Sequence, residues 1–280
     1  MTVSPPTMTV VTPSYNQGRF LERTIRSVLE QGYPNLEYIV MDGGSTDGSV
    51  EIIRRYADQL AFWRTGPDGG QSAAINAGWR MATGDIIAWQ NSDDVYLSGA
   101  LHAIGQAFLE HPEAVLIYGR TQRIDAEGVP LGTIGSAYNR RTLHYSHQQI
   151  PLTSAFFRRS AVEAVGLLDE ALHYSMDLDL FLRLTRLAPP VMLDRTLAEA
   201  TIHADAKTTR DRDIAAGETH IVRRRHARGA GALLVRLQPG FSWTFRRMPA
   251  WVRSAVNRLR PRRVYEDGRT ATSSTERPGP

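Results

Sequence analysis

The sequence predicts an α/β fold, in which short strands and helices alternate along the chain and the strands form one sheet. From residue 7 to residue 118, β-rich runs alternate with amphipathic stretches, which is the pattern of βαβ units with parallel strands. Of the 280 residues, 42% are hydrophobic and 22% are charged. This composition is ordinary for a globular protein with one large domain, or with one domain and an appendage.

Each element follows from its local residue pattern. The run at 7–12 contains two valines and is bounded by Pro13, so we expect a strand. Apolar residues three and four positions apart predict a helix over 19–31. The same reasoning gives strands at 38–41, 61–63, 86–89 and 115–118, and helices at 50–56, 72–81 and 99–109. Ser98 is the expected N-cap of the last of these helices.

Polar loops follow four of the predicted strands, at residues 13–16, 42–48, 66–71 and 91–94. The carboxyl ends of parallel strands meet at one edge of a sheet, where ligands bind in α/β proteins. The sequence therefore predicts a ligand site at this edge. Asp42, at the tip of the second strand, can accept a hydrogen bond from a ribose hydroxyl or a base N–H. The alternative for Asp42 is a helix N-cap or an Asx turn.

Two adjacent acids, Asp93 and Asp94, follow the strand at 86–89. They can form an ordinary solvated turn, because Asn, Ser and Asp are common turn residues. However, two like charges side by side repel each other, and a turn needs only one of them. The pair gains a purpose if it holds a divalent cation, which prefers hard oxygen ligands.

A dinucleotide-binding dehydrogenase is the competing enzyme class for such a sheet edge. That class carries Gly-x-Gly-x-x-Gly between the first strand and the first helix. Here the turn reads Pro-Ser-Tyr-Asn-Gln-Gly, with one glycine at Gly18. The pattern argues against an oxidoreductase.

Two stretches resemble the family-2 glycosyltransferases of the GT-A fold: TVVTPSYNQGRFLERTIRSVLEQGYPNLEYIVMDGGSTDGS and GDIIAWQNSDD. The resemblance covers about residues 7–205 and rests on the ordered set of motifs, each of which is weak alone. It implies a Rossmann-like mixed sheet flanked by helices, here followed by a basic helical C-terminal extension.

The resemblance also implies a nucleotide-sugar donor and the residues that hold it. Tyr15 and Asp42 match positions that hold the base, with Pro13 nearby. Asp93 matches the acid that contacts the ribose, and Asp94 matches the acid that ligates Mg²⁺ or Mn²⁺ at the donor diphosphate. The two acids would then have separate partners, and the cation would remove their repulsion.

The chain departs from the family pattern in the helix at 72–81. Many members carry Ala-Arg-Asn there, whereas this chain has Ala74-Ile75-Asn76. Because this chain lacks the arginine of that pattern, a diphosphate contact from this helix is in doubt. Gln71 can replace that contact, or it can simply occupy the helix N-terminus. Asn76 and Gly78 are open between site and packing roles.

The acceptor half of the resemblance begins near residue 151 and contains the acidic motif Asp177-Leu178-Asp179. The family places its catalytic base in this motif, and Asp177, at the start of the helix, matches better than Asp179. The alternative for Asp177 is a carboxylate that caps the positive end of the helix. Asp179 is expected to be a hydrogen-bonding partner.

Four further residues keep two interpretations each. In related transferases a histidine in the region of His203 completes the metal shell, but a lone histidine is often structural. Lys207 can pair with the diphosphate or be solvated. Trp89 and Tyr174 can pack on a sugar or on the core.

Charge divides the chain into two parts. Of the 33 basic and 29 acidic residues, 14 arginines and three acids lie in 221–280, which leaves 19 basic and 26 acidic residues in 1–220. The predicted organisation is a GT-A domain over 1–220, a basic aromatic segment over 221–265 and a disordered tail over 266–280. Trp243, Phe245 and Trp251 lie among the arginines, a composition that suits an anionic membrane surface. An acidic protein partner and RNA are the alternatives, and no nucleic acid is expected because no RNA motif accompanies the segment.

The chain has no cysteine, which fits a reducing compartment. The N-terminus carries no secretory signal pattern, and no apolar run reaches the length of about 18 residues that a membrane span needs. We therefore expect a cytoplasmic enzyme at the inner face of the cell membrane. The predicted activity is inverting, metal-dependent transfer of a sugar from a nucleoside diphosphate, with a UDP-sugar as the expected donor. The expected acceptor is a lipid-linked or polysaccharide glycan of the cell envelope, and the rival interpretation is a non-catalytic nucleotide-sugar or glycan-binding module.

Overall fold

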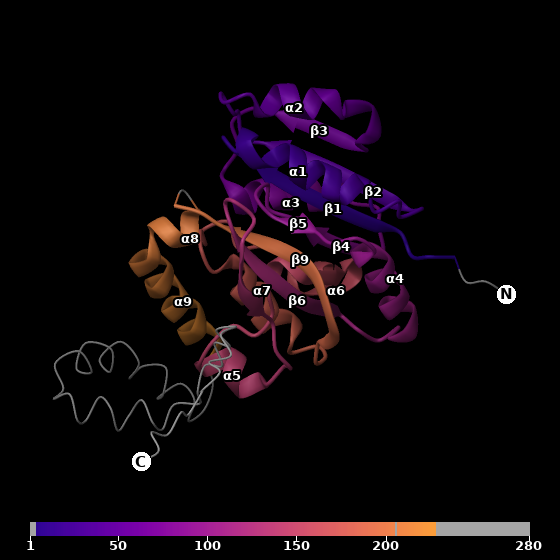
Figure 1. The fold of residues 1–280 in the computed structure, drawn as a ribbon. Coiled ribbons are helices and arrows are strands. Elements are labelled where there is room, and N and C mark those ends of the chain that lie inside the picture. Colours follow the sequence, from indigo (N-terminus) through magenta and orange to yellow (C-terminus); the bar gives the residue numbers. More distant parts are fainter. Residues whose placement is uncertain (1–3, 205, 228–280) are drawn as a thin grey trace, which may run out of the picture.

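A mixed sheet forms the centre of the molecule, with helices on both faces (Figure 1). The computed structural model describes residues 4–204 and 206–227. In that part of the chain the sheet has nine strands, in the order β3-β2-β1-β4-β8-β6-β9-β5, and β7 pairs with β6 outside this path. The sheet confirms the predicted α/β class and the mixed sheet that the resemblance implies.

The first four strands are parallel, as the βαβ pattern predicts. They are β1 (Met8–Ser14), β2 (Leu36–Asp42), β3 (Phe62–Thr65) and β4 (Ile86–Trp89). β1 lies between β2 and β4, and β3 pairs with the outer side of β2. In this register Ser14 is opposite Asp42 and Asp42 is opposite Thr65. Three of the polar loops therefore leave the sheet from neighbouring strands at one edge.

The remaining strands introduce antiparallel pairs. They are β5 (Val95–Tyr96), β6 (Leu116–Asp125), β7 (Pro130–Ile134), β8 (Ala155–Arg158) and β9 (Val191–Ile202). β8 runs antiparallel to both β4 and β6, β6 and β9 are parallel, and β5 is antiparallel to β9. The long strand β9 thus brings residues near 200 next to the loop that holds Asp93 and Asp94 (Figure 1).

Successive residues of the strands point to opposite faces, so each face has its own core. Val10, Tyr38 and Val40 pack with helices α1 (Gly18–Leu29), α2 (Ser49–Arg55) and α4 (Ala100–Glu110). Their neighbours Val11 and Ile39 pack with α3 (Gln71–Met81), α6 (Arg159–Val165) and α7 (Met176–Leu184). Short helices α5 (Arg140–Tyr145), η1 (Ala57–Gln59) and η2 (Leu152–Ser154) complete the connections. The two faces make one rigid frame for the loops at the strand ends.

The last described helix, α9 (Arg212–His226), follows the short α8 (Lys207–Arg210) and packs against α7 and α5. Val222 of α9 is completely buried in the core that contains α7. The predicted boundary at residue 220 therefore falls inside a packed helix, and residues 221–226 continue that helix. The rest of the predicted basic segment, including Trp243, Phe245 and Trp251, and the predicted tail at 266–280 lie outside the described residues.

A glycine begins α4. Gly99 has φ of 73° and is the N-cap, so the prediction that Ser98 caps this helix is wrong. A left-handed backbone at the cap is accessible to glycine and is strained for serine. In the part of the chain that the structure describes, no helix has the length and the apolar character needed to cross a bilayer.

Candidate active site

Asp42 organises the loop that follows β2. Its Oδ2 accepts hydrogen bonds from the backbone N–H groups of Gly44 and Ser45, at 3.1 and 2.9 Å, and from Thr65 Oγ1 at 2.6 Å. Its Oδ1 accepts from Ser45 Oγ at 2.5 Å. The Asx-type turn that was the alternative at this position is therefore present, and Asp42 is 1% exposed. Asp42 holds the loop in place whether or not it also contacts a base.

The loop after β1 meets the loop after β2. Tyr15 is 63% exposed, and a Cβ placed on Gly43 would lie 3.3 Å from its ring. Asn16, with φ of 51°, accepts a hydrogen bond from the Thr46 N–H at 2.9 Å. Pro13 lies buried in β1, opposite Met41. The exposed ring of Tyr15 is thus presented beside the glycine-rich turn that Asp42 shapes.

The two adjacent acids point to different partners. Asp94 is 6% exposed and accepts from the Thr201 N–H at 3.1 Å, from Asn91 Nδ2 at 3.2 Å and from Thr153 Oγ1 at 3.3 Å. Burial, and then the negative charge of Asp93, raise the pKa of Asp94 well above its usual range. Two such acids next to each other at a strand end are unfavourable unless a cation is shared with them.

His203 closes the other side of this pair. Its Nε2 lies 3.1 Å from Oδ2 of Asp93, and its ring packs on Phe20 with the centroids 4.6 Å apart. His203 is 8% exposed, and its Nδ1 is buried without a hydrogen-bond partner among the described residues. Nε2 of His203 therefore contacts Asp93 rather than Asp94.

The donor chemistry of Asp93, Asp94 and His203 fits Mg²⁺ or Mn²⁺, because carboxylate oxygens are hard ligands and imidazole accepts Mn²⁺. Nε2 of His203, 3.1 Å from Oδ2 of Asp93, is the ring nitrogen that faces the acids. Among the described residues, however, no group of three or more acidic or histidine side chains is already arranged around a metal position. A cation here would need further oxygen ligands from a bound molecule or water.

The N-terminus of α3 is tied to the acidic loop. Gln71 Nε2 donates to Asn91 Oδ1 at 2.9 Å, and Asn91 in turn donates to Asp94. Asn76 is 1% exposed and exchanges hydrogen bonds with the backbone of Leu168, so it packs the fold. A Cβ on Gly78 would lie 2.6 Å from Val11. Of this helix, Gln71 reaches the predicted site, whereas Asn76 and Gly78 serve packing.

Trp89 and Tyr174, which the sequence left between a sugar-binding and a core role, both contact other protein side chains. Trp89 is 1% exposed and stacks on Phe157 with a centroid distance of 5.8 Å, so it belongs to the core. Tyr174 donates from its hydroxyl to Asp211 at 2.8 Å, and the ammonium of Lys207 lies 5.0 Å from the centroid of its ring. Burial lowers the pKa of Lys207. Tyr174 and Lys207 thus form one contact between α8, α9 and the segment before α7.

Asp177 lies in the first turn of α7. Its Oδ2 accepts from Gln148 Nε2 at 2.7 Å, and its Oδ1 accepts from the Leu178 N–H at 2.7 Å. Burial raises the pKa of Asp177, and the negative charge of Glu218 adds to that effect. Protein atoms surround the carboxylate although the residue is partly reached by solvent. A recessed carboxylate with a raised pKa is suited to accept a proton.

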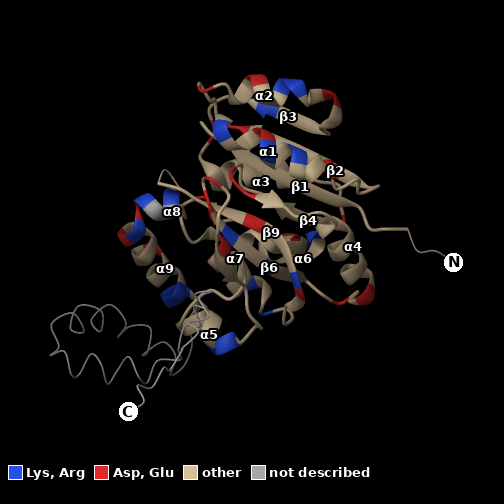
Figure 2. Ribbon diagram, in the orientation of Figure 1, with Lys and Arg blue, Asp and Glu red and all other residues tan. Residues whose placement is uncertain are grey.

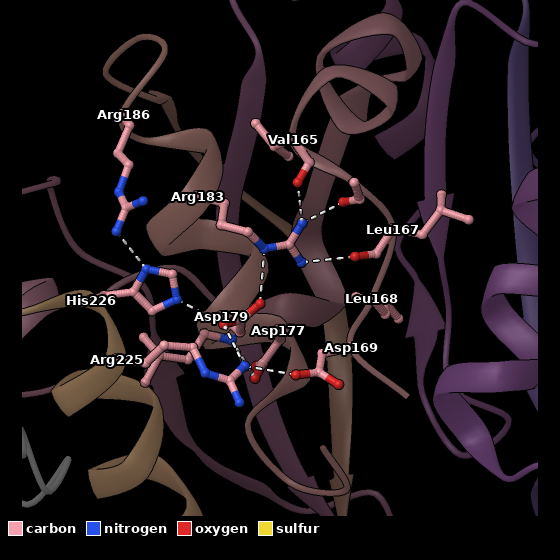
Figure 3. Close-up of polar contacts among 12 residues, drawn as sticks. Val165, Leu167, Leu168, Asp169, Asp177, Asp179, Arg183, Arg186, Arg225 and His226 are labelled. Atoms are coloured by element: carbon pink, nitrogen blue, oxygen red, sulfur yellow. Dashed lines mark hydrogen bonds and ion pairs between the residues drawn. The ribbon is translucent and has the colours of Figure 1, made fainter. Parts of the chain in front are cut away.

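Asp179 points into the protein instead. It is 3% exposed and is bound by His226 Nε2 at 2.7 Å and by Arg183 Nε at 2.8 Å (Figure 3). Arg183 also donates to the carbonyls of Val165 and Leu167 (Figure 3). Asp179 therefore has the hydrogen-bonding role that the sequence predicts for it.

One segment links Asp177 with the acidic pair. Gln148, which binds Asp177, and Thr153, which binds Asp94, are five residues apart in the connection between α5 and β8. Five residues span at most about 18 Å of extended chain. The two predicted halves of the site therefore lie on either side of one short segment.

Sequence reasoning missed Gln148, Thr153, Glu218 and His226. The partners are 29 positions apart for Gln148 and Asp177, and 47 for His226 and Asp179. Local periodicity carries no information about such pairs. From residue 221 onwards the sequence predicts a basic segment. That prediction overlooked His226, which binds Asp179 of α7.

Comparison with known proteins places this geometry among transferases. A family model described as glycosyl transferase family 2 matches residues 9–166. An uncharacterized glycosyltransferase of Mycobacterium tuberculosis (strain CDC 1551 / Oshkosh) is 31% identical over 201 residues, which are 70% of this chain and 75% of the relative. Chondroitin synthase of Pasteurella multocida (strain Pm70) is 24% identical over 74% of this chain and 22% of its own length.

An uncharacterized glycosyltransferase of Rickettsia typhi (strain ATCC VR-144 / Wilmington) is 27% identical over 73% of this chain. The matched part spans 66% of that relative, which is just under two thirds of its length.

Solved structures share the fold. S. aureus TarS in complex with UDP-GlcNAc superposes with a TM-score of 0.64 at 16% identity, over 81% of this chain and 69% of that one. The mannosyltransferase PcManGT of Pyrobaculum calidifontis, in complex with GDP-Man and Mn²⁺, gives a TM-score of 0.62 at 17% identity, over 91% of this chain and 80% of that one. At these identities the likeness confirms the GT-A-type fold.

Proposed function

The chain belongs to glycosyl transferase family 2, and from that premise we propose that it moves a sugar from a nucleoside diphosphate to an acceptor hydroxyl, with inversion at the anomeric carbon. The observation that carries this proposal is the connection between α5 and β8, which contacts Asp94 through Thr153 and Asp177 through Gln148. A donor held at the acidic pair would then have its sugar on the side of Asp177.

In this proposal the base of the donor lies between Tyr15 and the turn that Asp42 shapes, with Pro13 beneath. Tyr15 supports this role because its ring is exposed beside Gly43. Asp42 could reach a base N–H or a ribose hydroxyl through Oδ1, which has one partner, Ser45 Oγ. A UDP-sugar is our expected donor, and the complex of TarS with UDP-GlcNAc supports this choice.

Asp93 and Gln71 would hold the ribose and the diphosphate. Asp93 supports this because its carboxylate is partly exposed and lies next to Asp94, and Gln71 because it is tied to Asn91 in the same loop. Asp94 and His203 would hold Mg²⁺ or Mn²⁺, and a bound cation would stabilise the negative charge of the leaving diphosphate. The complex of PcManGT with GDP-Man and Mn²⁺ supports the choice of this ion.

Asp177 would act as the general base. Its raised pKa makes the carboxylate more basic, and it accepts the proton of the acceptor hydroxyl as oxygen attacks the anomeric carbon. Attack from the face opposite the leaving diphosphate gives inversion. Gln148 donates to Oδ2 of Asp177 and therefore orients the carboxylate. The acceptor we propose is a lipid-linked or polysaccharide glycan of the cell envelope.

We also propose that the protein works at the cytoplasmic face of an anionic membrane. The described residues support this through α9, whose Ile214 and Ile221 are 61% and 57% exposed and lie seven positions apart. Basic residues lie on α5, on α8 and at the end of α9 (Figure 2). Apolar side chains beside arginines favour binding in the headgroup region.

The test of the activity is a thermal-shift panel of UDP-, GDP- and dTDP-sugars with and without Mn²⁺, because a ligand of the folded state raises Tm. The sugar that shifts Tm is then offered with lipid-linked and glycan acceptors, and the product anomer is read by NMR. We expect one nucleotide class to shift Tm in the presence of Mn²⁺ and the product to be inverted. Donor binding without any transfer to acceptor or water would instead favour a non-catalytic binding module.

The test of the membrane proposal is co-sedimentation with vesicles of phosphatidylserine and phosphatidylcholine at low and high salt. We expect the full chain to bind at low salt and to be released as salt screens the charges. A chain of residues 1–227 should keep donor binding and sediment less. Failure of the full chain to bind such vesicles at low salt would count against a membrane role.

A further inference from the structure

Glu218 of α9 takes up the backbone N–H groups that lead into α7. Its Oε2 accepts from the His173 N–H at 2.9 Å, and its Oε1 accepts from the Tyr174 and Ser175 N–H groups, both at 2.6 Å. Next to it, the hydroxyls of Thr219 and Ser175 are 2.8 Å apart. Three short bonds to one carboxylate fix the backbone two residues before Asp177.

The same face of α9 holds α7 again about two turns further along. His226 donates to Asp179 at 2.7 Å, and Val222 is buried between these two contacts. Positions 218, 222 and 226 repeat every four residues, so they share one face of the helix. α7 is thus held to α9 on either side of Asp177, at Ser175 and at Asp179.

The negative charge of Glu218 also acts on Asp177, and it adds to burial, which is the larger cause of the raised pKa of Asp177. N–H groups at the start of a helix carry partial positive charge and favour the anionic form of a nearby carboxylate. Glu218 accepts from the N–H groups of His173, Tyr174 and Ser175, which lead into α7, and Asp177 accepts from the Leu178 N–H inside α7. The charge of Glu218 therefore lies at the same helix start as Asp177.

We propose that Glu218 is a positioning residue for transfer: by accepting from the N–H groups of His173, Tyr174 and Ser175 it fixes the start of α7 so that Asp177 meets the acceptor. This inference rests on the proposed role of Asp177 as the base. It gives one residue of α9, Glu218, a role in transfer, although the sequence of α9 shows no motif of the family resemblance.

Charged groups near Asp177 and Glu218 are few among the described residues. Asp179 is compensated by Arg183 and His226, and Gln148 is neutral. Lys207 and Asp211 contact the side chain of Tyr174, and Lys207 also interacts electrostatically with Glu218. Glu218 is the charged group that raises the pKa of Asp177, after burial.

The test compares kcat, donor KM and the pH dependence of kcat/KM in four variants. Glu218→Gln removes the charge and keeps the size. Glu218→Asp keeps the charge but withdraws the carboxylate by one methylene. Asp213→Asn removes an exposed carboxylate from the first turn of the same helix and is the matched control. Asp177→Asn is the reference for loss of the base.

For Glu218→Gln we expect kcat to fall by roughly tenfold, well short of the loss of about 10²–10⁴ for removal of a base. Donor KM should hold, and the acidic limb of the profile should move to lower pH because the pKa of Asp177 falls. Glu218→Asp should lose kcat with the limb at its wild-type position, and Asp213→Asn should match wild type. An unchanged kcat in Glu218→Gln overturns the inference.

Two further outcomes bear on the assignment of the base and on the fold of the variant, respectively. If Asp177→Asn keeps activity within a few-fold of wild type, the assignment of the base fails, and the proposed function is revised whatever Glu218 does. If Glu218→Gln melts below the assay temperature, Glu218→Asp decides: an unchanged kcat in that variant rules out positioning by Glu218. In both cases Tm is measured first, so that loss of fold is not read as loss of catalysis.

Discussion

Nε2 of His226 lies 2.7 Å from Oδ1 of Asp179, and both residues are more than nine-tenths buried (Figure 3). Arg186 donates to Nδ1 of the same imidazole at 2.7 Å. Arginine cannot accept a hydrogen bond, so Nδ1 of His226 is the acceptor. Nε2 therefore carries the hydrogen and donates the hydrogen bond to Asp179. The contact joins the final turn of α9 to the helix that carries Asp177.

Asp179→Asn should change the acid stability of the protein. Burial would raise the pKa of Asp179, but the hydrogen bond from His226 and the charge of Arg183 outweigh it and lower the pKa. A lowered pKa contributes stability that is present above the ordinary value of about 3.9 and is lost as pH falls through the folded value. Urea unfolding at a series of pH values should therefore show that the free energy of unfolding falls less below about pH 4 in Asp179→Asn than in wild type.

At pH 7 the same variant should be less stable by about 3–5 kcal/mol, because it leaves Arg183 partly buried without its carboxylate. Asp58→Asn, an exposed acid in η1, is the control. An equal pH slope in wild type and Asp179→Asn would contradict the assignment of the ion pair.

Truncation should place the end of the folded unit after α9. A chain of residues 1–227 keeps Val222 and His226, whereas a chain of residues 1–220 loses both. We expect the shorter chain to be less stable by about 2–5 kcal/mol, because it loses apolar burial and leaves Asp179 without His226. Circular dichroism melts of both chains measure the difference. Equal Tm values would support a boundary at residue 220.

Asp177→Asn should lower kcat by about 10²–10⁴ and leave donor affinity nearly unchanged. Asparagine keeps the size and the contact with the Leu178 N–H but cannot take a proton at neutral pH. Steady-state kinetics and calorimetry with the donor measure the two effects. A reduction of only a few-fold would move the search for the base to Glu218 or to a water that it holds.

Asp94→Asn should remove the Mn²⁺ dependence of donor binding. The amide keeps the contact with the Thr201 N–H but lacks the charge, so loss of folding is not expected to obscure the result. Calorimetry of UDP with Mn²⁺ and with EDTA compares the variant with wild type, and Asp58→Asn is the control. Unchanged Mn²⁺-dependent affinity in Asp94→Asn would remove Asp94 from the metal site.

His144 should make stability depend on pH between about 4 and 6.5. Burial, together with the positive charges of Arg140, Arg186 and Arg223, lowers the pKa of His144 from 6.5 to about 4. The unfolded chain then binds more protons in this range, so stability is fully present above pH 6.5 and falls as pH drops towards 4. His144→Gln should remove part of this slope, on the order of 1–3 kcal/mol over the range. His102→Gln, on an exposed histidine, should keep it, and the same slope in both variants would contradict the effect.

Much of the first half of the fold follows from local patterns. The strand at 86–89 lies where its short apolar run predicts it, and all four of its residues are buried. The buried residues of α1 are spaced three and four positions apart, as the predicted apolar stripe requires. The βαβ pattern correctly predicts the parallel pairs of β1 to β4. It says nothing of β8, whose place between β4 and β6 is set by packing across the sheet. β5 has two residues and no periodicity to detect.

The site shows the same division. The positions of Asp93, Asp94 and Asp177 at element ends could be read from composition and from motif resemblance. The partner of each acid could not, because Thr201 and Gln148 are 107 and 29 positions away from the acids they bind. The prediction that Ser98 caps α4 is wrong for a local reason, since Gly99 reaches a left-handed conformation that serine avoids.

The connection that carries both Gln148 and Thr153 has a thermodynamic consequence. A donor that draws Asp94 away from Thr153 acts on the same short segment that orients Asp177 through Gln148. Occupancy of one half of the site then changes the free energy of ligand binding to the other half, and the change is equal in both directions. Such reciprocity makes the affinities for donor and acceptor interdependent, although the two ligands contact different residues. The sign of the coupling is set by which arrangement of the segment each ligand prefers.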